Sequence, residues 1–158
     1  MAATRTERSK NCKVVAPGDR PAVRLGGLSI TPNAAAADTN GELTLLEIEA
    51  ASGAGSPVHV CHFESKIFYV LDGEFSIRLN GETVAGGPGT CAHVPRGAVH
   101  GFTNVGTGPG RLLVMLTPAG HEKFLVAMSR LEARGATMPG YPTDHVNDLC
   151  DTHGVELL

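Results

Sequence analysis

The side chains best suited to chemistry lie in two stretches of the chain, residues 57–74 and residues 89–104. The first stretch contains His59 and Cys61, and the second contains His100. Residues two apart on a β-strand share a face, so His59 and Cys61 are expected to point the same way. If the sheet that carries these residues closes on itself, all three side chains can meet inside it. Two imidazoles and a thiolate are suitable ligands for zinc, iron, copper or nickel.

Lys66, close behind in the first stretch, is open to two interpretations. It is either a solvated lysine at the end of a strand, or a partly buried lysine near His59 that acts as a base or holds an anion. His62 and Glu64 are expected at the rim of the pocket or in solvent. The remaining histidines have no spacing that indicates a partner, at positions 93, 121, 145 and 153.

A series of short β-strands is expected to position these residues. Residues 42–50 alternate with a period of two and place four side chains on one face, Thr44, Leu46, Ile48 and Ala50. Asp72-Gly73 is a hairpin signal between two apolar runs. Further strands are predicted at 14–16, 22–25, about 58–63, 66–71, 74–79, 83–84, 90–94, 99–105 and 111–117, with a loop at 31–41. Many short strands separated by turns indicate an all-β sandwich or barrel.

The pattern changes after Pro118. Residues 122–134 place apolar side chains at helical spacing, which predicts an amphipathic helix that packs one face on the barrel. A shorter helix is predicted at 144–151. We therefore expect a loose tail at 1–12, a barrel at 13–117 and a helical extension at 118–158.

Size and composition restrict the class of protein. A chain of 158 residues with 42% hydrophobic residues is expected to form one globular domain. The net charge is −3, and the Lys and Arg residues form no cluster, so nucleic acid is not expected as a partner. No apolar run is long enough to span a bilayer, and the polar N-terminus has no secretory signal, so no membrane contact is expected. Four cysteines far apart indicate reduced thiols in a cytoplasmic protein, with Cys91 and Cys150 buried.

Two groups of residues carry a resemblance to a known family. Gly53, His59 and Gly73 fit the first motif of the cupins, G-x5-H-x-H-x3,4-E-x6-G, in part. The second cupin motif, G-x5-P-x-G-x2-H-x3-N, is matched in full by Gly89, Pro95, Gly97, His100 and Asn104. With its flanking segments, the chain resembles small single-domain cupins of the quercetin-dioxygenase-like group over roughly residues 20–158. The resemblance implies a double-stranded β-helix, the cupin jelly-roll barrel, with two C-terminal α-helices and commonly a homodimer.

The chain departs from the family pattern at two ligand positions. Cys61 stands where the motif has its second histidine, and Lys66 stands where it has its glutamate. An ammonium group close to a divalent ion is strongly repelled in a partly dry site. The predicted metal ligands are thus His59, Cys61 and His100, with Glu64 as a possible further ligand if the turn shifts its register. The predicted cofactor is either none or one divalent metal ion: Fe, Ni, Mn or Zn.

Three functions are open at this point. The first is an enzyme that acts on a small apolar molecule by non-redox acid/base chemistry, such as cyclisation, isomerisation or elimination. His59, Lys66 and His100 would then be catalytic, and Cys61, Phe68 and Phe102 would contact the substrate. The resemblance places such cupins in specialised metabolism, for instance as polyketide cyclases. The second function is a metal-dependent dioxygenase, and the third is a non-catalytic binding protein for a small molecule.

Overall fold

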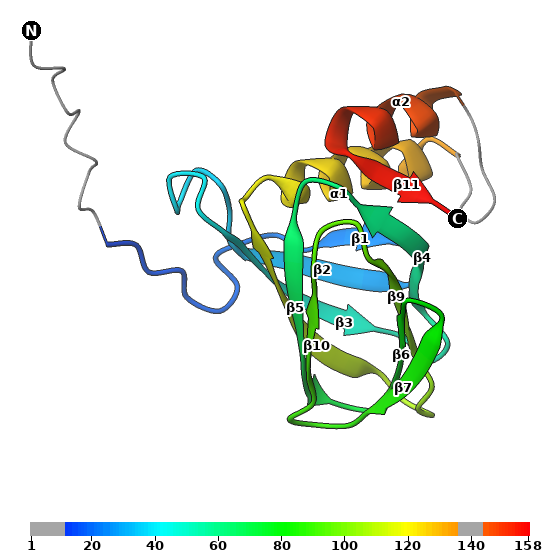
Figure 1. Cartoon of the computed structure of the whole chain (residues 1–158). Helices are drawn as coiled ribbons and strands as arrows, with labels where there is room; N and C mark the ends of the chain where they lie inside the picture. Colours follow the sequence, from blue (N-terminus) through cyan, green and yellow to red (C-terminus); the bar gives the residue numbers. More distant parts are fainter. Residues whose placement is uncertain (1–11, 136–143) are drawn as a thin grey trace, which may run out of the picture.

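The alternating strands form two antiparallel sheets that face each other and enclose the core (Figure 1). The computed structural model describes residues 12–135 and 144–158. One sheet has the spatial order β1 (Val23–Leu25), β2 (Leu28–Ala34), β3 (Thr44–Ala50), β10 (Gly110–Thr117), β5 (Ser65–Asp72) and β8 (Cys91–Val94). The other has the order β11 (Val155–Leu157), β4 (Gly55–Cys61), β9 (Val99–Asn104), β6 (Phe75–Leu79) and β7 (Glu82–Gly86).

Two helices lie together at one end of this barrel, α1 (His121–Ala133) and α2 (Asp144–His153) (Figure 1). The first helix buries Phe124 and Met128 on the side that faces the barrel. No helix in the described part of the chain is both long and apolar enough to cross a membrane. The predicted all-β barrel with two C-terminal helices is confirmed.

Period-two alternation decides which side chains form the core. In β3 the four predicted inward residues are at most 5% exposed: Thr44, Leu46, Ile48 and Ala50. The same alternation in β5 turns Lys66, Phe68 and Val70 inward. A lysine on the inward face cannot extend directly into solvent, so the register of β5 forces the Lys66 amine into the barrel.

Several strand boundaries differ from the sequence-based predictions. The predicted loop at 31–41 is partly wrong, because β2 continues to Ala34 and pairs with β3 across an irregularity at Pro32–Ala34. Residues 14–16 form no strand. Strand β4 begins at Gly55, where an added Cβ would overlap the carbonyl group of Phe102 on the neighbouring strand. The last strand, β11, was not predicted at all, and it pairs with the segment of β4 that carries His59 and Cys61.

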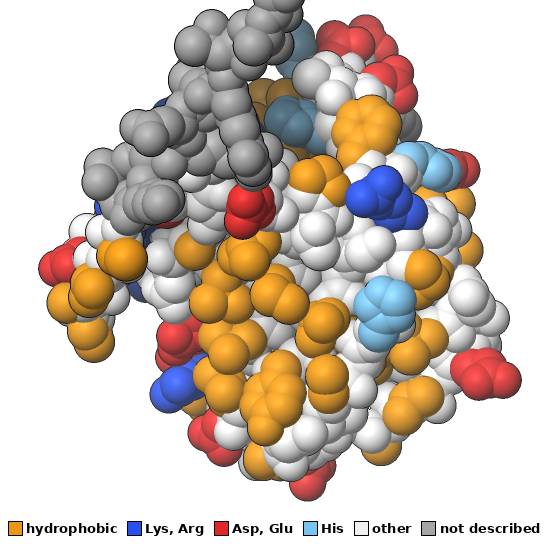
Figure 2. All heavy atoms as spheres, turned by 60° about the vertical axis from the view of Figure 1, so that its left-hand side comes forward, with side chains coloured by type: hydrophobic (Ala, Val, Ile, Leu, Met, Phe, Trp, Pro, Cys, Tyr) orange, Lys and Arg blue, Asp and Glu red, His pale blue; other side chains and the backbone are white. Residues whose placement is uncertain are grey.

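The outer face of the six-stranded sheet is rich in apolar side chains. Met115 of β10 lies between Leu45 and Ile67, and Leu113 lies beside Tyr69. Figure 2 shows hydrophobic side chains gathered on this side of the molecule, and Tyr69 is 42% exposed.

Cys91 also lies at the surface, so its predicted burial is wrong, whereas Cys150 is buried as predicted. On β8 the exposed residues Cys91 and His93 alternate with the less exposed Ala92 and Val94, so Cys91 occupies an outward position.

Candidate functional site

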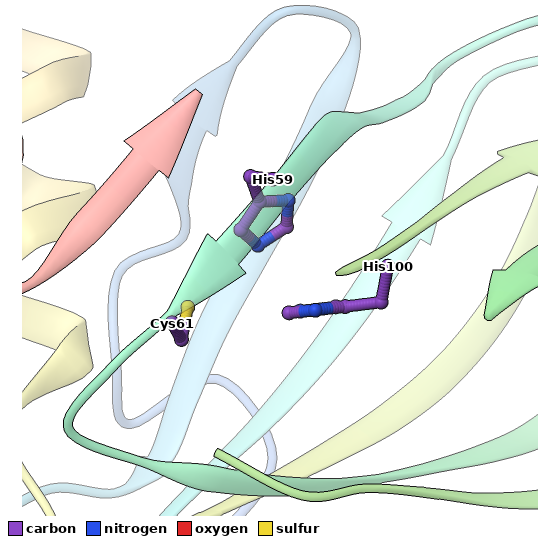
Figure 3. A group of neighbouring side chains, drawn as sticks. All are labelled: His59, Cys61 and His100. Atoms are coloured by element: carbon purple, nitrogen blue, oxygen red, sulfur yellow. The ribbon is translucent and has the colours of Figure 1, made fainter. Parts of the chain in front are cut away.

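Strand pairing brings the two predicted histidines together. His59 of β4 and His100 of β9 are directly opposite each other in the antiparallel ladder, and their ring centroids are 4.2 Å apart. Cys61 lies two residues further along β4 on the same face, as Figure 3 shows. One nitrogen of each histidine and the Cys61 sulfur all lie within 4.8 Å of one another. The strand register therefore places all three side chains inside the barrel.

Backbone carbonyl groups orient both imidazole rings. The Nδ1 atom of His59 lies 2.7 Å from the carbonyl oxygen of Pro57, and Nδ1 of His100 lies 2.9 Å from that of Ala98. A carbonyl oxygen only accepts hydrogen bonds, so each Nδ1 must carry the proton and each Nε2 must present a lone pair. The Nε2 atom of His100 is buried and has no hydrogen-bond partner.

Lys66 occupies the centre of this polar group. Its side chain is 4% exposed, and its Nζ atom lies 3.2 Å from Nε2 of His59. An N–H of Lys66 therefore donates to the one lone pair that His59 presents. Burial, together with the Lys66 ammonium and the His100 ring, holds the pKa of His59 well below its usual value. Burial and Lys66 likewise lower the pKa of His100 to about 4. Both imidazoles are therefore neutral at pH 7.

A second group of buried side chains adjoins the first and shares the Cys61 sulfur with it. It combines Cys61 with Glu64, from the bend between β4 and β5, and with His121, the first residue of α1. Glu64 and His121 are 6% and 5% exposed. The expected position of Glu64 at the rim or in solvent is therefore wrong, and His121 has neighbours that its spacing in the sequence did not indicate. No spacing rule could have found His121, because helix docking alone brings it to the site.

Burial dominates the titration of this second group as well. It raises the pKa of the Glu64 carboxyl group, an effect that Lys66 opposes. Burial and the Lys66 charge hold the pKa of His121 well below its usual value. Burial also raises the pKa of the Cys61 thiol, although Lys66 lies within hydrogen-bonding reach of the sulfur and works against this shift.

A cavity of about 410 Å³ opens between the two sheets beneath α1. This volume lies within the usual range for small-molecule sites, roughly 300–1,000 Å³. Its walls are mostly aliphatic and aromatic, and they include Leu28, Ile30, Leu46, Ile48, Phe68, Phe102, Val114, Leu116, Phe124 and Met128. Polar groups on the wall include those of His59, Lys66 and His121.

The predicted site residues divide into two sets at this cavity. His59, Lys66, Phe68 and Phe102 line it. Cys61, Glu64 and His100 are buried but are not among the residues that line it. His121 also lines the cavity, although no motif or spacing selected it.

The predicted metal set, His59, Cys61 and His100, fits a divalent ion poorly. A neutral imidazole nitrogen has one lone pair, and Lys66 already occupies that of His59. A metal ion on His59 would also lie within a few ångströms of the ammonium group, where two cations repel strongly. As Glu64 belongs to the other group, it supplies no negative charge between His59 and His100.

Comparisons with known proteins assign the family. The Cupin domain model matches residues 46–116, a span that contains both histidines of the first group, His59 and His100. The tetracenomycin polyketide synthase protein TcmJ of Streptomyces glaucescens is 31% identical over 109 residues, which are 67% of this chain and 71% of that protein. This chain belongs to the cupin family.

Solved structures of other cupins share the fold. The polyketide cyclase RemF of Streptomyces resistomycificus is 30% identical to this cupin, with a TM-score of 0.57 over 66% of this chain and 78% of that one. An RmlC-like cupin of Shewanella frigidimarina has a TM-score of 0.62 at 24% identity, over 70% of this chain and 94% of that one. The barrel of this chain is thus shared with these two structures.

Proposed function

We propose that this cupin is an enzyme that binds a small apolar organic molecule in its cavity and catalyses a non-redox proton transfer on it. The reaction would be a cyclisation, isomerisation or elimination in specialised metabolism. The observation that carries the proposal is the hydrogen bond between Lys66 and His59 at the wall of an apolar cavity. A buried acid/base pair of this kind is characteristic of functional sites.

The two side chains have complementary roles in such a reaction. Lys66 has three N–H donors and can hold the oxygen of a substrate carbonyl group while charge develops on it. Once the substrate oxygen draws Lys66 toward it, Nε2 of His59 is free to take a proton from the carbon next to the carbonyl. The oxyanion formed in this step offsets the Lys66 charge, which favours the imidazolium form of His59. The apolar walls exclude water and strengthen these charge interactions.

His100 acts behind His59 in this scheme. Its ring contacts that of His59 but does not line the cavity. We therefore assign His100 to the positioning of His59, and we keep His59 and Lys66 as the residues that touch the substrate.

The named relatives support the choice of reaction class. One is a polyketide cyclase and another is a polyketide synthase protein. A polyketide carries several carbonyl groups on a carbon chain, and its cyclisation begins with removal of a proton next to a carbonyl. An aliphatic cavity with a lysine and a neutral histidine suits that step.

Proton exchange on a simple ketone tests the proposal. The probe is an aryl methyl ketone in deuterated buffer with a chelator, and the exchange of its methyl protons is followed by NMR. We expect Lys66→Met and His59→Gln to reduce the protein-catalysed rate by about 10²–10⁴-fold, the usual contribution of general acid/base catalysis. His93→Gln changes a histidine that is exposed on β8 and serves as the matched control.

Two results would contradict the proposal. Exchange that is equally fast in Lys66→Met and in the unmodified protein would remove Lys66 from the chemistry. Saturable binding of the ketone with no exchange above the buffer rate would favour the non-catalytic binding protein. The dioxygenase alternative has no supporting observation here, because Lys66 occupies the His59 lone pair that an iron or nickel ion would need.

We also propose that the protein is a homodimer, as the family resemblance implies. The apolar outer face of the six-stranded sheet supports this assembly, since large exposed apolar patches often mark interfaces. Sedimentation velocity of the full chain measures it directly, and a monomer at micromolar concentration would contradict it.

A further inference from the structure

The buried atoms without partners gather at one place in the molecule. In the described residues, three buried side-chain atoms have no hydrogen-bond partner: Oε2 of Glu64, Nδ1 of His121 and Nε2 of His100. The first two belong to the group that Glu64 and His121 form with Cys61. Buried polar atoms in native proteins are nearly always satisfied, and an unsatisfied one needs an explanation such as an unseen ion or water.

We propose that Cys61, Glu64 and His121 bind one zinc ion, at a position distinct from that of the His59 and His100 pair. A thiolate, a carboxylate oxygen and an imidazole nitrogen are the three ligand types that Zn²⁺ takes from proteins. Three protein ligands leave a fourth tetrahedral position for water or for a polar group of a bound molecule.

The lone pairs explain why this set is better suited than the first. Lys66 uses the one lone pair of His59, which removes that nitrogen as a ligand. The sulfur of Cys61 also lies within reach of Lys66, but a thiolate has several lone pairs. It can accept an N–H from Lys66 and still bind a metal ion, so the lysine orients this ligand without blocking it.

The charges point the same way. The thiolate of Cys61 and the carboxylate of Glu64 together balance the two positive charges of the ion. The set with His59 and His100 offers only the thiolate, so one positive charge of the ion would stay unbalanced there, next to Lys66, which borders both sets. A buried ion is stable only when its charge is balanced nearby.

The ligand atoms of Cys61, Glu64 and His121 lie within 4.8 Å of one another, so they must move closer together to bind a zinc ion. Ligand atoms at 2.0–2.3 Å from a tetrahedral zinc ion stand roughly 3.3–3.7 Å apart. Nδ1 of His121 and Oε1 of Glu64 are 4.0 Å apart, so these two side chains need to approach by roughly half an ångström. The ion would join the first residue of α1 to the bend between β4 and β5. Because α1 contributes Phe124 and Met128 to the cavity wall, the same ion would restrain the position of α1 relative to the barrel and so stabilise that wall.

Cobalt titration of the chelator-treated full chain tests the site. Co²⁺ bound by a thiolate in tetrahedral geometry gives a charge-transfer band and intense visible bands, and Zn²⁺ should abolish both by competition. The parent protein for the titration carries Cys12→Ser and Cys91→Ser, which remove the two exposed thiols. We expect one equivalent of Co²⁺ to bind, with affinity reduced by Glu64→Gln and by His121→Gln at least about a hundredfold, because loss of a ligand should exceed the roughly 10–100-fold effect of losing a residue that only supports a ligand.

Matched variants separate this site from the other possible one. His59→Gln and His100→Gln should bind Co²⁺ within about threefold of the parent, because neither residue is a ligand here. The reverse pattern, with loss in His100→Gln and retention in His121→Gln, would overturn the proposal. Absence of saturable binding in the parent would also overturn it, and would assign the unpartnered atoms to water.

Folding of each variant is checked independently of metal. Circular dichroism and thermal unfolding in the presence of chelator show whether His121→Gln retains the barrel. Zn²⁺ should raise the Tm of the parent and leave that of a folded His121→Gln unchanged. An equal rise in Tm for both proteins would contradict the assignment of His121 as a ligand.

Discussion

The substitution Lys66→Met is the most informative single change in this protein, because it should increase stability while it removes activity. Lys66 is 4% exposed, and its Nζ atom lies 3.2 Å from a neutral imidazole nitrogen and within hydrogen-bonding reach of the Cys61 sulfur. No carboxylate oxygen of the described residues lies within 4.0 Å of its Nζ atom. Its charge is therefore buried without a close counter-ion, whereas methionine places a similar apolar chain in the same space.

The expected gain follows from two opposing terms. Burial of one ion costs several kcal/mol after relaxation, taken here as about 4, and a hydrogen bond from a charged group returns about 2 kcal/mol. The difference of about 2 kcal/mol is the expected rise in the free energy of unfolding. For a domain of this length, that corresponds to a rise in Tm of about 4–8 °C.

Urea and thermal unfolding at pH 7, with a chelator present, measure the effect. Lys123→Met is the matched control, because Lys123 is exposed on α1 and its loss should change stability by no more than about 0.5 kcal/mol. A decrease of more than about 1 kcal/mol in Lys66→Met would refute the reasoning. It would show that Lys66 forms a stabilising ion pair with Glu64, and that its charge serves the fold.

Three further predictions concern pH, a buried amide and the cavity. Because the pKa of His100 is about 4 in the folded chain and 6.5 ordinarily, the unfolded chain binds its proton first as the pH falls. The free energy of unfolding should therefore decline as the pH falls from 6.5 to 4, by about 1.4 kcal/mol per pH unit for each buried histidine with a lowered pKa. The raised pKa of Glu64 opposes part of this decline. His100→Gln should make the curve of unfolding free energy against pH flatter in this range. Asn104→Ala should lower the free energy of unfolding by about 2–4 kcal/mol. The reason is that the fully buried Asn104 side chain donates to the carbonyl groups of Ala50 and Gly108 and accepts from the N–H of Gly106. A loss of less than about 1 kcal/mol in urea unfolding would contradict this role. Val114 lines the cavity, so Val114→Phe should fill part of it and weaken the binding of an apolar fluorescent probe about tenfold or more. An unchanged affinity in a fluorescence titration would show that the probe binds outside the cavity.

Local patterns in the chain were sufficient to predict most of the barrel. Alternation in residues 42–50 predicted the inward face of β3, because strand geometry places every second side chain on the same side. The full second motif, from Gly89 to Asn104, indicated the family, which the comparisons confirm. The short C-terminal strand β11 was not predicted, since three residues carry too little periodicity and their conformation depends on pairing with β4.

The sequence by itself determined that His59 and Cys61 share a face, and that Lys66 stands where the cupin motif has its glutamate. Only the tertiary structure decided what Lys66 does: the register of β5 turns it inward, and the closure of the barrel places its amine on the lone pair of His59. The tertiary structure also brought His121 to Cys61 and Glu64, through the docking of α1 against the end of the barrel. Spacing along a strand is a local property of the chain, whereas contacts between a helix and a distant bend depend on packing that no local pattern encodes.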